Sequence, residues 1–408
     1  MRIGLLGFGV VGRGVYDITQ SREDMSVAAV LCLEDIQLPD AKVCKDYREI
    51  LEDQTIDTVV EAMGGLHPAY EFVRAAIEAG KNVVTSNKAL VATFYDELIP
   101  LAEEKGVKFR CTAAVGGGIG WLSEVERSRR IQNIHQVGGI MNGTCNYILD
   151  NMTRLGQDYS AVLKEAQKLG YAEANPSTDV DGIDTWHKVI LSSNIAFGIS
   201  LDTATVPVAG ISRITAEDVE NFRNHGYVCK LISTGKATDG KYAVYVQPTL
   251  CPAGSLEAAV PLNYNLITLI GDTSDRMSFY GQGAGRYPTA YNVVQDCVDL
   301  LEGKGFYAPY GETVAACNEG KLTWYTGEHL NVQKGFFDLM KKAAQHSWDY
   351  IAFCDQDDVW DLDKLSIAVK QLEGLRDDLP ALYYCGQRLV DGERNFLADH
   401  YLNDRRSH

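Results

Sequence analysis

Four carboxylates and a lysine fall within residues 170–188, and their types and spacing could carry chemistry. They are Glu173, Asp179, Asp181, Asp184 and Lys188. A cluster of acids beside one lysine suits a ligand with an ammonium group, while the lysine donates a proton to a reacting oxygen. The simpler interpretation of the Asp184/Lys188 pair is a solvated surface salt bridge, worth about 0.3–0.5 kcal/mol. These residues alone leave both interpretations open.

The surrounding pattern predicts a loop and then a helix. Asn175-Pro176 disfavours helical backbone, so the preceding helix should end near Gly170 and an irregular loop should carry Glu173 and Asp179. After residue 182 apolar side chains recur at helical spacing, at Ile183, Trp186, Ile190 and Leu191. On that helix the aspartate and the lysine are one turn apart, opposite the apolar stripe.

A glycine-rich turn near residue 10 indicates a dinucleotide site. The apolar strand Ile3–Leu6 runs directly into the turn and then into a helix. In this context glycines allow a tight turn and close approach to a pyrophosphate, which the helix N-terminus stabilises. We therefore assign cofactor binding to Gly7, Phe8, Gly9, Val10, Val11 and Gly12.

The second predicted strand, Val27–Leu33, ends at Glu34-Asp35. An acid about 20 residues after the glycines accepts hydrogen bonds from the ribose hydroxyls and disfavours a 2′-phosphate. Because no arginine stands at this strand end, the sequence favours NAD over NADP. A solvated loop position for Glu34 is the simpler alternative.

Strands and helices alternate through the first part of the chain. Thr58–Glu61, Asn82–Thr85 and Val107–Cys111 read as further buried strands. The alternation implies a parallel, doubly wound sheet of the Rossmann type. Ligands bind beyond the carboxyl ends of such strands, so the tips Met63-Gly64-Gly65 and Ser86-Asn87-Lys88 should face the cofactor. The topology explains Lys88 equally well as an ordinary surface lysine.

A second domain is expected from residue 136 onward. Alternating segments such as Tyr242–Val246 predict an α+β domain with a mostly antiparallel sheet, which lies under the substrate site and pairs subunits. The helix Ala290–Leu301 should return to the first domain. We therefore divide the chain into a dinucleotide domain, 1–135 with the returning segment 287–320, and a substrate and dimerisation domain, 136–286.

Composition restricts the partners. The chain of 408 residues carries a net charge of −17, which argues against nucleic-acid and anionic-membrane surfaces and leaves small molecules and copies of itself. Ten cysteines occur singly, which fits a reducing compartment, and we expect a cytoplasmic protein. No stretch reaches the ~18 apolar residues of a membrane span. Gly9, Gly12 and Gly14 interrupt the opening apolar run, unlike in a signal peptide.

Six motifs, taken in order, resemble the homoserine dehydrogenase family over roughly residues 1–320. They are the glycine turn at 7–12, Ser86–Leu90, Val115–Ile119, Gly139–Leu149, the stretch 170–188 and Gly281–Ala290. That family interconverts L-homoserine and L-aspartate 4-semialdehyde with NAD(P), on the route to threonine and methionine. The resemblance implies this activity and a homodimer.

The resemblance also implies roles for single residues. Lys188 resembles the family's proton-transfer lysine, Lys88 its second lysine, close to nicotinamide and substrate, and Glu173, Asp179 and Asp184 the acids that hold the amino acid. An ammonium donor also stabilises developing alkoxide charge, which agrees with these roles. Gly283 is expected to approach the cofactor, although a tight turn explains it as well.

The family further binds a monovalent cation, largely through backbone oxygens of a loop that matches residues 112–119. On that match the carbonyls of Val115, Gly117 and Ile119 are ligands. This sequence departs twice: Thr112 stands where an acidic ligand is usual, and Gly120 where a proline is usual. The first change removes a carboxylate and the second could loosen the loop, so the ion is left open.

Residues 322–408 resemble a different family. Tyr325–Val332 and Tyr350–Leu365 are similar to the middle of a family 2 glycosyltransferase domain, which predicts a small α/β appendage. In those enzymes an Asp-x-Asp sequence, here Asp355 and Asp357, holds a divalent ion on a nucleotide-sugar diphosphate. Surface acids are the simpler interpretation. Because the resemblance is partial, we favour a fused remnant or docking element over sugar transfer. Activity in this segment, or a dehydrogenase for a related amino alcohol, are the competing functions.

Overall fold

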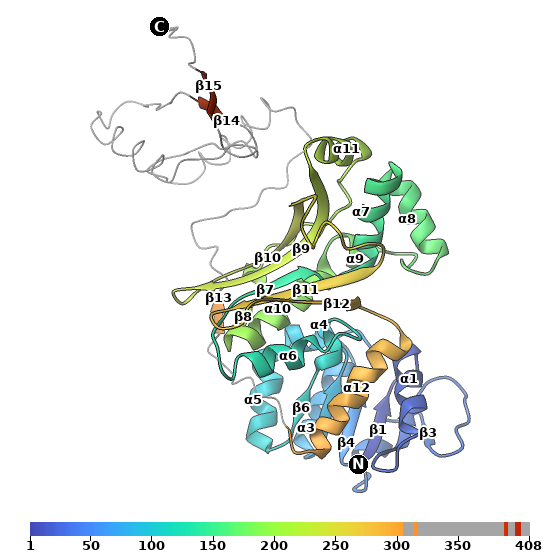
Figure 1. The fold of residues 1–408 in the computed structure, drawn as a ribbon. Helices are drawn as coiled ribbons and strands as arrows, with labels where there is room; N and C mark the ends of the chain where they lie inside the picture. The colour runs from blue at the N-terminus through green and yellow to red at the C-terminus, as the bar shows by residue number, and fades with distance from the viewer. Residues whose placement is uncertain (305–312, 316–386, 391–395, 401–408) are drawn as a thin grey trace, which may run out of the picture. The chain divides into compact units, whose positions relative to one another are not determined.

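The computed structural model describes residues 1–304, 313–315, 387–390 and 396–400 (Figure 1). The chain divides into two compact units, Met1–Trp324 and Tyr325–His408. The described part of the second unit is an antiparallel pair of strands, β14 (Gln387–Val390) and β15 (Phe396–His400). The predicted divalent-ion ligands, Asp355 and Asp357, lie outside the described residues.

The first sheet has six parallel strands in the order β3-β2-β1-β4-β5-β6. They are β1 (Arg2–Leu6), β2 (Ser26–Leu31), β3 (Lys42–Cys44), β4 (Thr58–Glu61), β5 (Asn82–Thr85) and β6 (Phe109–Arg110). This is the predicted doubly wound arrangement. The strand order reverses between β1 and β4, which opens a crevice beside the turn that follows β1.

Helices cover both faces of this sheet, which is why its strands read as continuous apolar runs. They are α1 (Val10–Thr19) and α12 (Arg286–Leu301) on one face, and α3 (Ala69–Glu78) and α5 (Tyr95–Lys105) on the other (Figure 1). Neighbouring residues of β1 point to opposite cores: Leu5 packs with α1 and α12, and Leu6 with α3. Helix α12 packs against α1 of the first sheet, and the assignment of residues 287–320 to the first domain stays a prediction.

Two details of the first sheet differ from the prediction. Strand β2 ends at Leu31 rather than at Leu33, and Leu33 is 87% exposed in the following loop. An isolated apolar loop residue is indistinguishable from a strand end in the sequence pattern. The edge strand β3 was not predicted, because three residues are too short for a periodic signal; the short helix α2 (Arg48–Leu51) follows it.

The second sheet has five antiparallel strands in the order β10-β9-β7-β11-β12. They are β7 (Ile134–Ile140), β9 (Tyr227–Thr238), β10 (Lys241–Pro252), β11 (Tyr264–Gly271) and β12 (Asp275–Gln282). The predicted antiparallel sheet is therefore confirmed. Gly138 is required in β7, because a Cβ there would lie 2.1 Å from the carbonyl oxygen of Ser233 on β9. The short β8 (Ser200–Asp202) pairs in parallel with β13 (Thr313–Ala315).

Helix α10 (Ile183–Phe197) lies between the two sheets, against β7 and β9 on one side and α4 and α6 on the other (Figure 1). The remaining helices are α4 (Lys88–Thr93), α6 (Trp121–Ser128), α7 (Gly143–Leu155), α8 (Tyr159–Lys168), α9 (Ser177–Val180), α11 (Ala216–Asn224) and the 3-10 turns η1 (Thr112–Ala114) and η2 (Thr203–Thr205). One hydrophobic core joins Trp121, Leu191 and Ile267, so both sheets belong to one packed body. The predicted domain boundaries at 135 and 286 stay predictions.

Two further observations bear on the compositional predictions. Within the described part of the chain, no helix is long and apolar enough to cross a membrane. The described cysteines are buried free thiols: Cys32, Cys44, Cys111, Cys145, Cys229, Cys251 and Cys297. This agrees with the interpretation of the cysteines as single residues rather than as a disulfide framework.

Candidate active site

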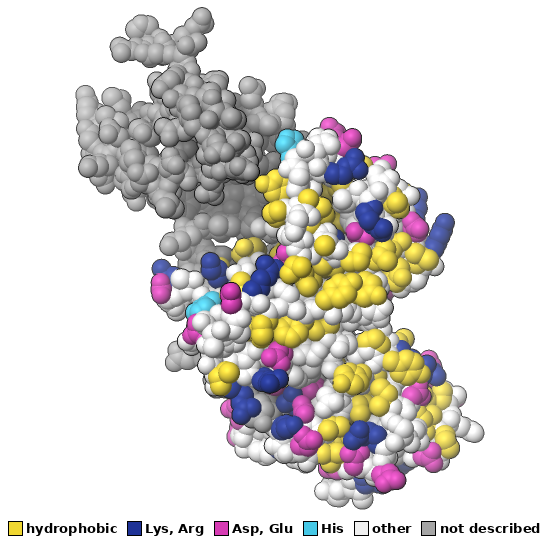
Figure 2. All heavy atoms as spheres, in the orientation of Figure 1, with side chains coloured by type: hydrophobic (Ala, Val, Ile, Leu, Met, Phe, Trp, Pro, Cys, Tyr) yellow, Lys and Arg dark blue, Asp and Glu magenta, His cyan; other side chains and the backbone are white. Residues whose placement is uncertain are grey.

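A cleft of about 720 Å³ lies where the glycine turn after β1 meets the second sheet. The molecule is hollowed between the parts that carry the two sheets (Figure 2). The predicted site residues that line the cleft are Val10, Val11, Ser86, Lys88, Gly117, Glu173, Asp179, Asp184, Lys188 and Gly283. The fold therefore brings the predicted cofactor turn and the predicted proton-transfer cluster to one cavity.

The centre of the cleft is a triad of charges, of which two are buried and one is partly exposed. Nζ of Lys188 lies 2.7 Å from Oδ2 of Asp184 and donates to the carbonyl oxygen of Met141 at 2.7 Å. Nζ of Lys88 lies 3.0 Å from Oδ1 of Asp184. The Asp184 and Lys188 side chains are only 8% and 9% exposed, against 36% for Lys88. The interpretation of this pair as a solvated surface salt bridge is therefore wrong.

The charges of the triad shift the pKa values of Asp184 and Lys88. Burial opposes ionisation of Asp184, but the charges of Lys188 and Lys88 outweigh it and hold the pKa of Asp184 well below its ordinary value. The charge of Asp184 in turn raises the pKa of Lys88, against burial. Burial, followed by the repulsion of Asp184, raises the pKa of Asp179. Asp179 is thus a carboxylate whose ionisation the protein opposes and a cationic ligand would favour.

Asn142 connects the acids, and the sequence did not reveal this role. Its Nδ2 donates to Oδ1 of Asp179 at 2.7 Å and to Oδ2 of Asp184 at 2.8 Å. Its Oδ1 accepts from the backbone N–H of Cys145 at 2.8 Å and caps α7. An asparagine before Gly143 signals a helix start. Nothing in the neighbouring sequence indicates that its side-chain N–H groups bridge two carboxylates that are far away in the chain.

Asp179 lies on a short helix rather than on the predicted irregular loop. Helix α9 begins after Pro176, whose carbonyl oxygen accepts from the N–H groups of Asp179 and Val180, each at 2.9 Å. The fixed φ of proline suits a helix start, and this preference acts on the residues after Pro176 while Asn175 stays non-helical. Glu173 lies on an exposed loop at the rim of the cleft. The predicted helix end is confirmed, since α8 stops at Lys168.

A second network of hydrogen bonds fixes the conformation of the loops that follow β4 and β5. The buried Glu61 accepts from the N–H groups of Met63 at 2.8 Å and Gly64 at 3.2 Å, and from the hydroxyl of Thr85 at 2.5 Å. Asn87 donates to the carbonyl oxygen of Gly65 at 2.6 Å. Sequence analysis missed Glu61, although an acid at the end of an apolar strand is a usable signal. The network holds Lys88 at the start of α4.

The glycine turn has the shape that a dinucleotide requires. A Cβ on Gly12 would lie 2.1 Å from the carbonyl oxygen of Gly7, whereas Gly9 has open space around it. No side chain caps α1, so its first N–H groups face the turn. The Phe8 side chain packs against Tyr16 in the core, which leaves its backbone at the turn. The residues present fit a bound pyrophosphate, and their assignment to the cofactor stays a prediction.

The end of β2 differs from the prediction in its charges. The sequence has no arginine there, but the fold brings Arg13 of α1 to Glu34, with Nη2 of Arg13 2.9 Å from Oε2 of Glu34. Lys45 donates to the carbonyl oxygens of Leu33 at 2.6 Å and Glu34 at 2.7 Å. The acid that the sequence assigned to the ribose therefore has two cations beside it.

The predicted cation ligands occupy a loop that contacts α12. Gly117 lines the cleft, and Val115 and Ile119 are buried behind it. The side-chain amide of Asn292 donates to the carbonyl oxygens of Gly117 and Ile119. Two of the three predicted carbonyls therefore already accept from the protein, and with Thr112 in place of an acid the residues present do not fit a bound cation.

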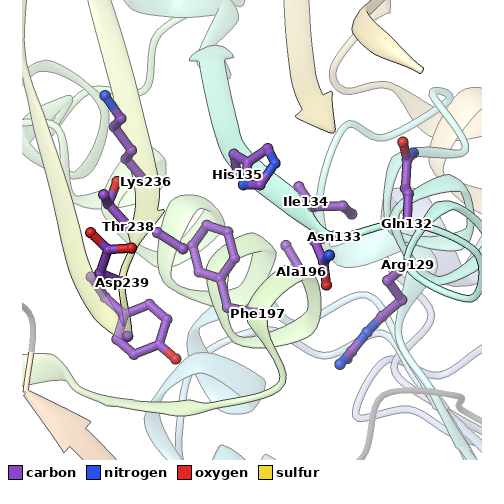
Figure 3. A pocket seen from close by; sticks show the side chains of 13 residues that line it. Arg129, Gln132, Asn133, Ile134, His135, Ala196, Phe197, Lys236, Thr238 and Asp239 are labelled. Carbon is purple, nitrogen blue, oxygen red and sulfur yellow. The ribbon is translucent and has the colours of Figure 1, made fainter. Parts of the chain in front are cut away.

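A second cavity, of about 700 Å³, lies at the far end of α10 and is lined by residues such as Arg129, His135, Phe197 and Lys236 (Figure 3). None of the predicted site residues that the structure describes lines it. Arg129 and Lys236 stand on opposite sides of this space in Figure 3 and do not converge on one point.

A parallel sheet with this glycine turn, and a lysine–carboxylate pair in the cleft beside the turn, are the features of a dinucleotide-dependent dehydrogenase. Comparisons with known proteins are specific about which one. A family model described as "Homoserine dehydrogenase, NAD binding domain" matches residues 7–112, and one described as "Homoserine dehydrogenase" matches residues 121–298. The chain belongs to the homoserine dehydrogenase family, and it is an oxidoreductase with an NAD(P)-binding domain.

Individual relatives agree. The chain is 36% identical to the homoserine dehydrogenase of Bacillus subtilis over 316 residues, which are 74% of this chain and 73% of the relative. It is similar to the crystal structure of a homoserine dehydrogenase from Thiobacillus denitrificans, with 37% identity, a TM-score of 0.70, and coverage of 74% and 73%. A hyperthermophilic archaeal homoserine dehydrogenase in complex with NADPH shares the fold, with a TM-score of 0.65 at 22% identity over 75% of this chain and 99% of that one.

Proposed function

We propose that Lys188 is the proton donor and acceptor when L-aspartate 4-semialdehyde and L-homoserine are interconverted. The observation that carries this proposal is the position of its ammonium group: it lines the cleft, and two of its three protons are engaged, by Asp184 and by the Met141 carbonyl. The bound nicotinamide would supply or accept the hydride. Lys188 would move the proton at the substrate oxygen and stabilise its charge, while Asp184 keeps the ammonium in place.

The acids next to this pair would bind the amino end of the substrate. Asp179 is a poorly compensated carboxylate, and Glu173 stands at the rim, so a substrate ammonium would improve the electrostatics of both. Lys88 would assist by holding Asp184 anionic and by binding the substrate carboxylate.

A substrate panel tests the whole assignment. Purified full-length chain should oxidise L-homoserine, followed at the nicotinamide absorbance, and should oxidise 4-hydroxybutyrate, which lacks the ammonium, far more slowly. Asp179→Asn should raise KM for homoserine by about tenfold or more and leave 4-hydroxybutyrate unaffected. Equal losses with both compounds would contradict ammonium recognition. A preference for another amino alcohol in the same panel would favour the competing dehydrogenase function.

For the cofactor we propose NAD(P), with NAD preferred. Glu34 supports this preference, since it neutralises Arg13 and presents a carboxylate where a 2′-phosphate would lie. The ammonium group of the nearby Lys45 would instead favour the 2′-phosphate of NADP. Glu34→Ala should lower the ratio of kcat/KM for NAD to that for NADP; an unchanged ratio would remove Glu34 from the ribose site.

We propose a homodimer that forms through the face of the second sheet opposite α10. Tyr264 and Tyr280 stack on this face with ring centroids 5.0 Å apart, and Tyr280 is 54% exposed. Apolar side chains lie over the second sheet in Figure 2. Light scattering during gel filtration should give twice the chain mass, and Tyr280→Lys should shift the species toward the monomer.

For the tail we propose a fused remnant or docking element. A glycosyltransferase role would require turnover of a nucleotide sugar with Mg²⁺ or Mn²⁺, and a full-length sample that shows it would overturn this assignment.

The buried free thiols support a reducing compartment, and we infer a cytoplasmic location.

A further inference from the structure

Helix α12 holds both ends of the loop of residues 112–119, which we call the glycine run. Asn292 and Asp296 lie one turn apart on α12 and are 2% and 1% exposed. Nδ2 of Asn292 donates to the carbonyl oxygens of Gly117 at 2.5 Å and Ile119 at 3.2 Å. Oδ2 of Asp296 accepts from the backbone N–H of Thr112 at 2.8 Å. One face of one helix therefore fixes the run from its first residue to its last.

The amide of Asn292 and a cation would compete for the same oxygens. The resemblance assigned the carbonyls of Gly117 and Ile119 to a monovalent ion. An ion that both oxygens coordinate would lie where the amide protons of Asn292 point, and the positive ends of these N–H bonds would repel it. The two arrangements exclude each other.

The charge balance also argues against an ion. Thr112 replaces the usual acid, and its hydroxyl shares a hydrogen bond of 2.9 Å with Ser123. The nearby carboxylate of Asp296 is already paired with Nε of Arg110 at 3.0 Å. Burying an ion without a carboxylate to balance it is strongly unfavourable. The change at position 112 and the amide at position 292 therefore act in the same direction.

We propose that the side-chain amide of Asn292 replaces the monovalent cation in this chain, so that the glycine run keeps its geometry without a bound ion. Gly117 lines the cleft, as do Ala113 and Ala114, so Asn292 is a positioning residue for the site. The reversed amide would set its Oδ1 against two carbonyl oxygens, which is favourable only with a cation between them. Ion dependence therefore separates the two arrangements.

The test measures thermal unfolding and homoserine oxidation of the full-length chain in equal concentrations of NaCl, KCl and tetramethylammonium chloride. The wild type should have the same melting midpoint and kcat in all three salts. In the tetramethylammonium salt Asn292→Ala should melt roughly 2–6 °C lower, because two buried carbonyl oxygens lose their donor. Gln295→Ala removes an amide from the exposed side of the same helix and should melt with the wild type.

Two results would overturn the proposal. One is a saturable rise of the wild-type melting midpoint or kcat with Na⁺ or K⁺, which would show that an ion occupies these carbonyls. The other is an Asn292→Ala chain that melts with the wild type in the tetramethylammonium salt, which would show that the amide does not hold the run.

Discussion

The first unit contains two clusters of oppositely charged side chains, one beside the cleft and one enclosed by the protein. In the cleft, Asp184 lies between Lys188 and Lys88. Behind α12, Arg110 lies between Asp296, Glu126 and Asp299, at N···O distances of 3.0, 3.3 and 3.1 Å. The guanidinium is 3% exposed, and the charges of Asp296 and Glu126 overcome its burial and hold the pKa of Arg110 above its usual value.

The two clusters differ in whether their cation can still donate a hydrogen bond to a ligand. Three carboxylates surround the Arg110 fork, and Asp296 is also used by the Thr112 backbone. Lys188 borders a cavity and has a proton to give to a ligand. A buried ion pair by itself therefore indicates neither stability nor function. The cavity beside one member is the reason why we propose the first cluster as the site, whereas the second holds α12 against the glycine run.

The largest expected effect is on chemistry in the cleft. Lys188→Ala should lower kcat for homoserine oxidation by about 10²–10⁴-fold, because the proton donor is lost, while the cofactor still binds by nicotinamide fluorescence. Lys81 provides the control: it is also buried and donates to the carbonyl oxygens of Asp53 and Ile56, far from the cleft. Lys81→Ala should cost stability and keep kcat. An active Lys188→Ala enzyme would refute the assigned role.

The second cluster should respond in the opposite way. Arg110→Met leaves buried carboxylates without their cation, so the free energy of unfolding should fall by about 3–5 kcal/mol, measured with urea. The folded fraction should retain its KM for homoserine. Arg74→Met, which removes the exposed pairs to Glu78 and Glu97, should leave the urea midpoint close to that of the wild type. Comparable losses in both variants would mean that the inner cluster contributes no more than a surface pair.

The pH dependence sharpens the comparison further. The pKa of Asp184 is lowered in the folded state, so its contribution is present above its unfolded pKa of about 3.9 and disappears as pH falls through the folded value. The pKa of Lys88 is raised, so its contribution is complete below about 10.4 and disappears as pH rises through the folded value. Asp184→Asn should therefore cost about 1–3 kcal/mol, constant between about pH 5 and 9. A cost that varies within this interval would contradict the assigned charges.

The smallest effect concerns Asp179. Its raised pKa means that its ionisation works against folding above the unfolded pKa of about 3.9. At pH 7 Asp179→Asn should stabilise the ligand-free chain by under about 1 kcal/mol, and this gain should vanish below about pH 4. Thermal melts at both pH values measure it. Destabilisation at pH 7 would mean that Asn142 compensates the carboxylate fully.

Much of the site was predictable because its signals are local. The glycine turn follows a strand and precedes a helix, and the Asp184/Lys188 spacing and the helix end before Gly170 depend on a few neighbouring residues. Short-range sterics, hydrogen bonding and apolar periodicity determine such elements wherever the rest of the chain lies. The resemblance then supplied the order of the motifs, which the family matches agree with.

The sequence by itself determined the two sheets, the dinucleotide turn and the lysine–carboxylate stretch. Only the tertiary structure decided that Lys88 reaches Asp184, that Asn142 bridges two acids, that Arg13 meets Glu34 and that Asn292 takes two carbonyls of the glycine run. These polar contacts join residues far apart in the chain. These contacts form only because α4, α7, α10 and α12 pack on the sheets as they do. The residues next to a polar side chain in the sequence do not indicate which distant group it will bind.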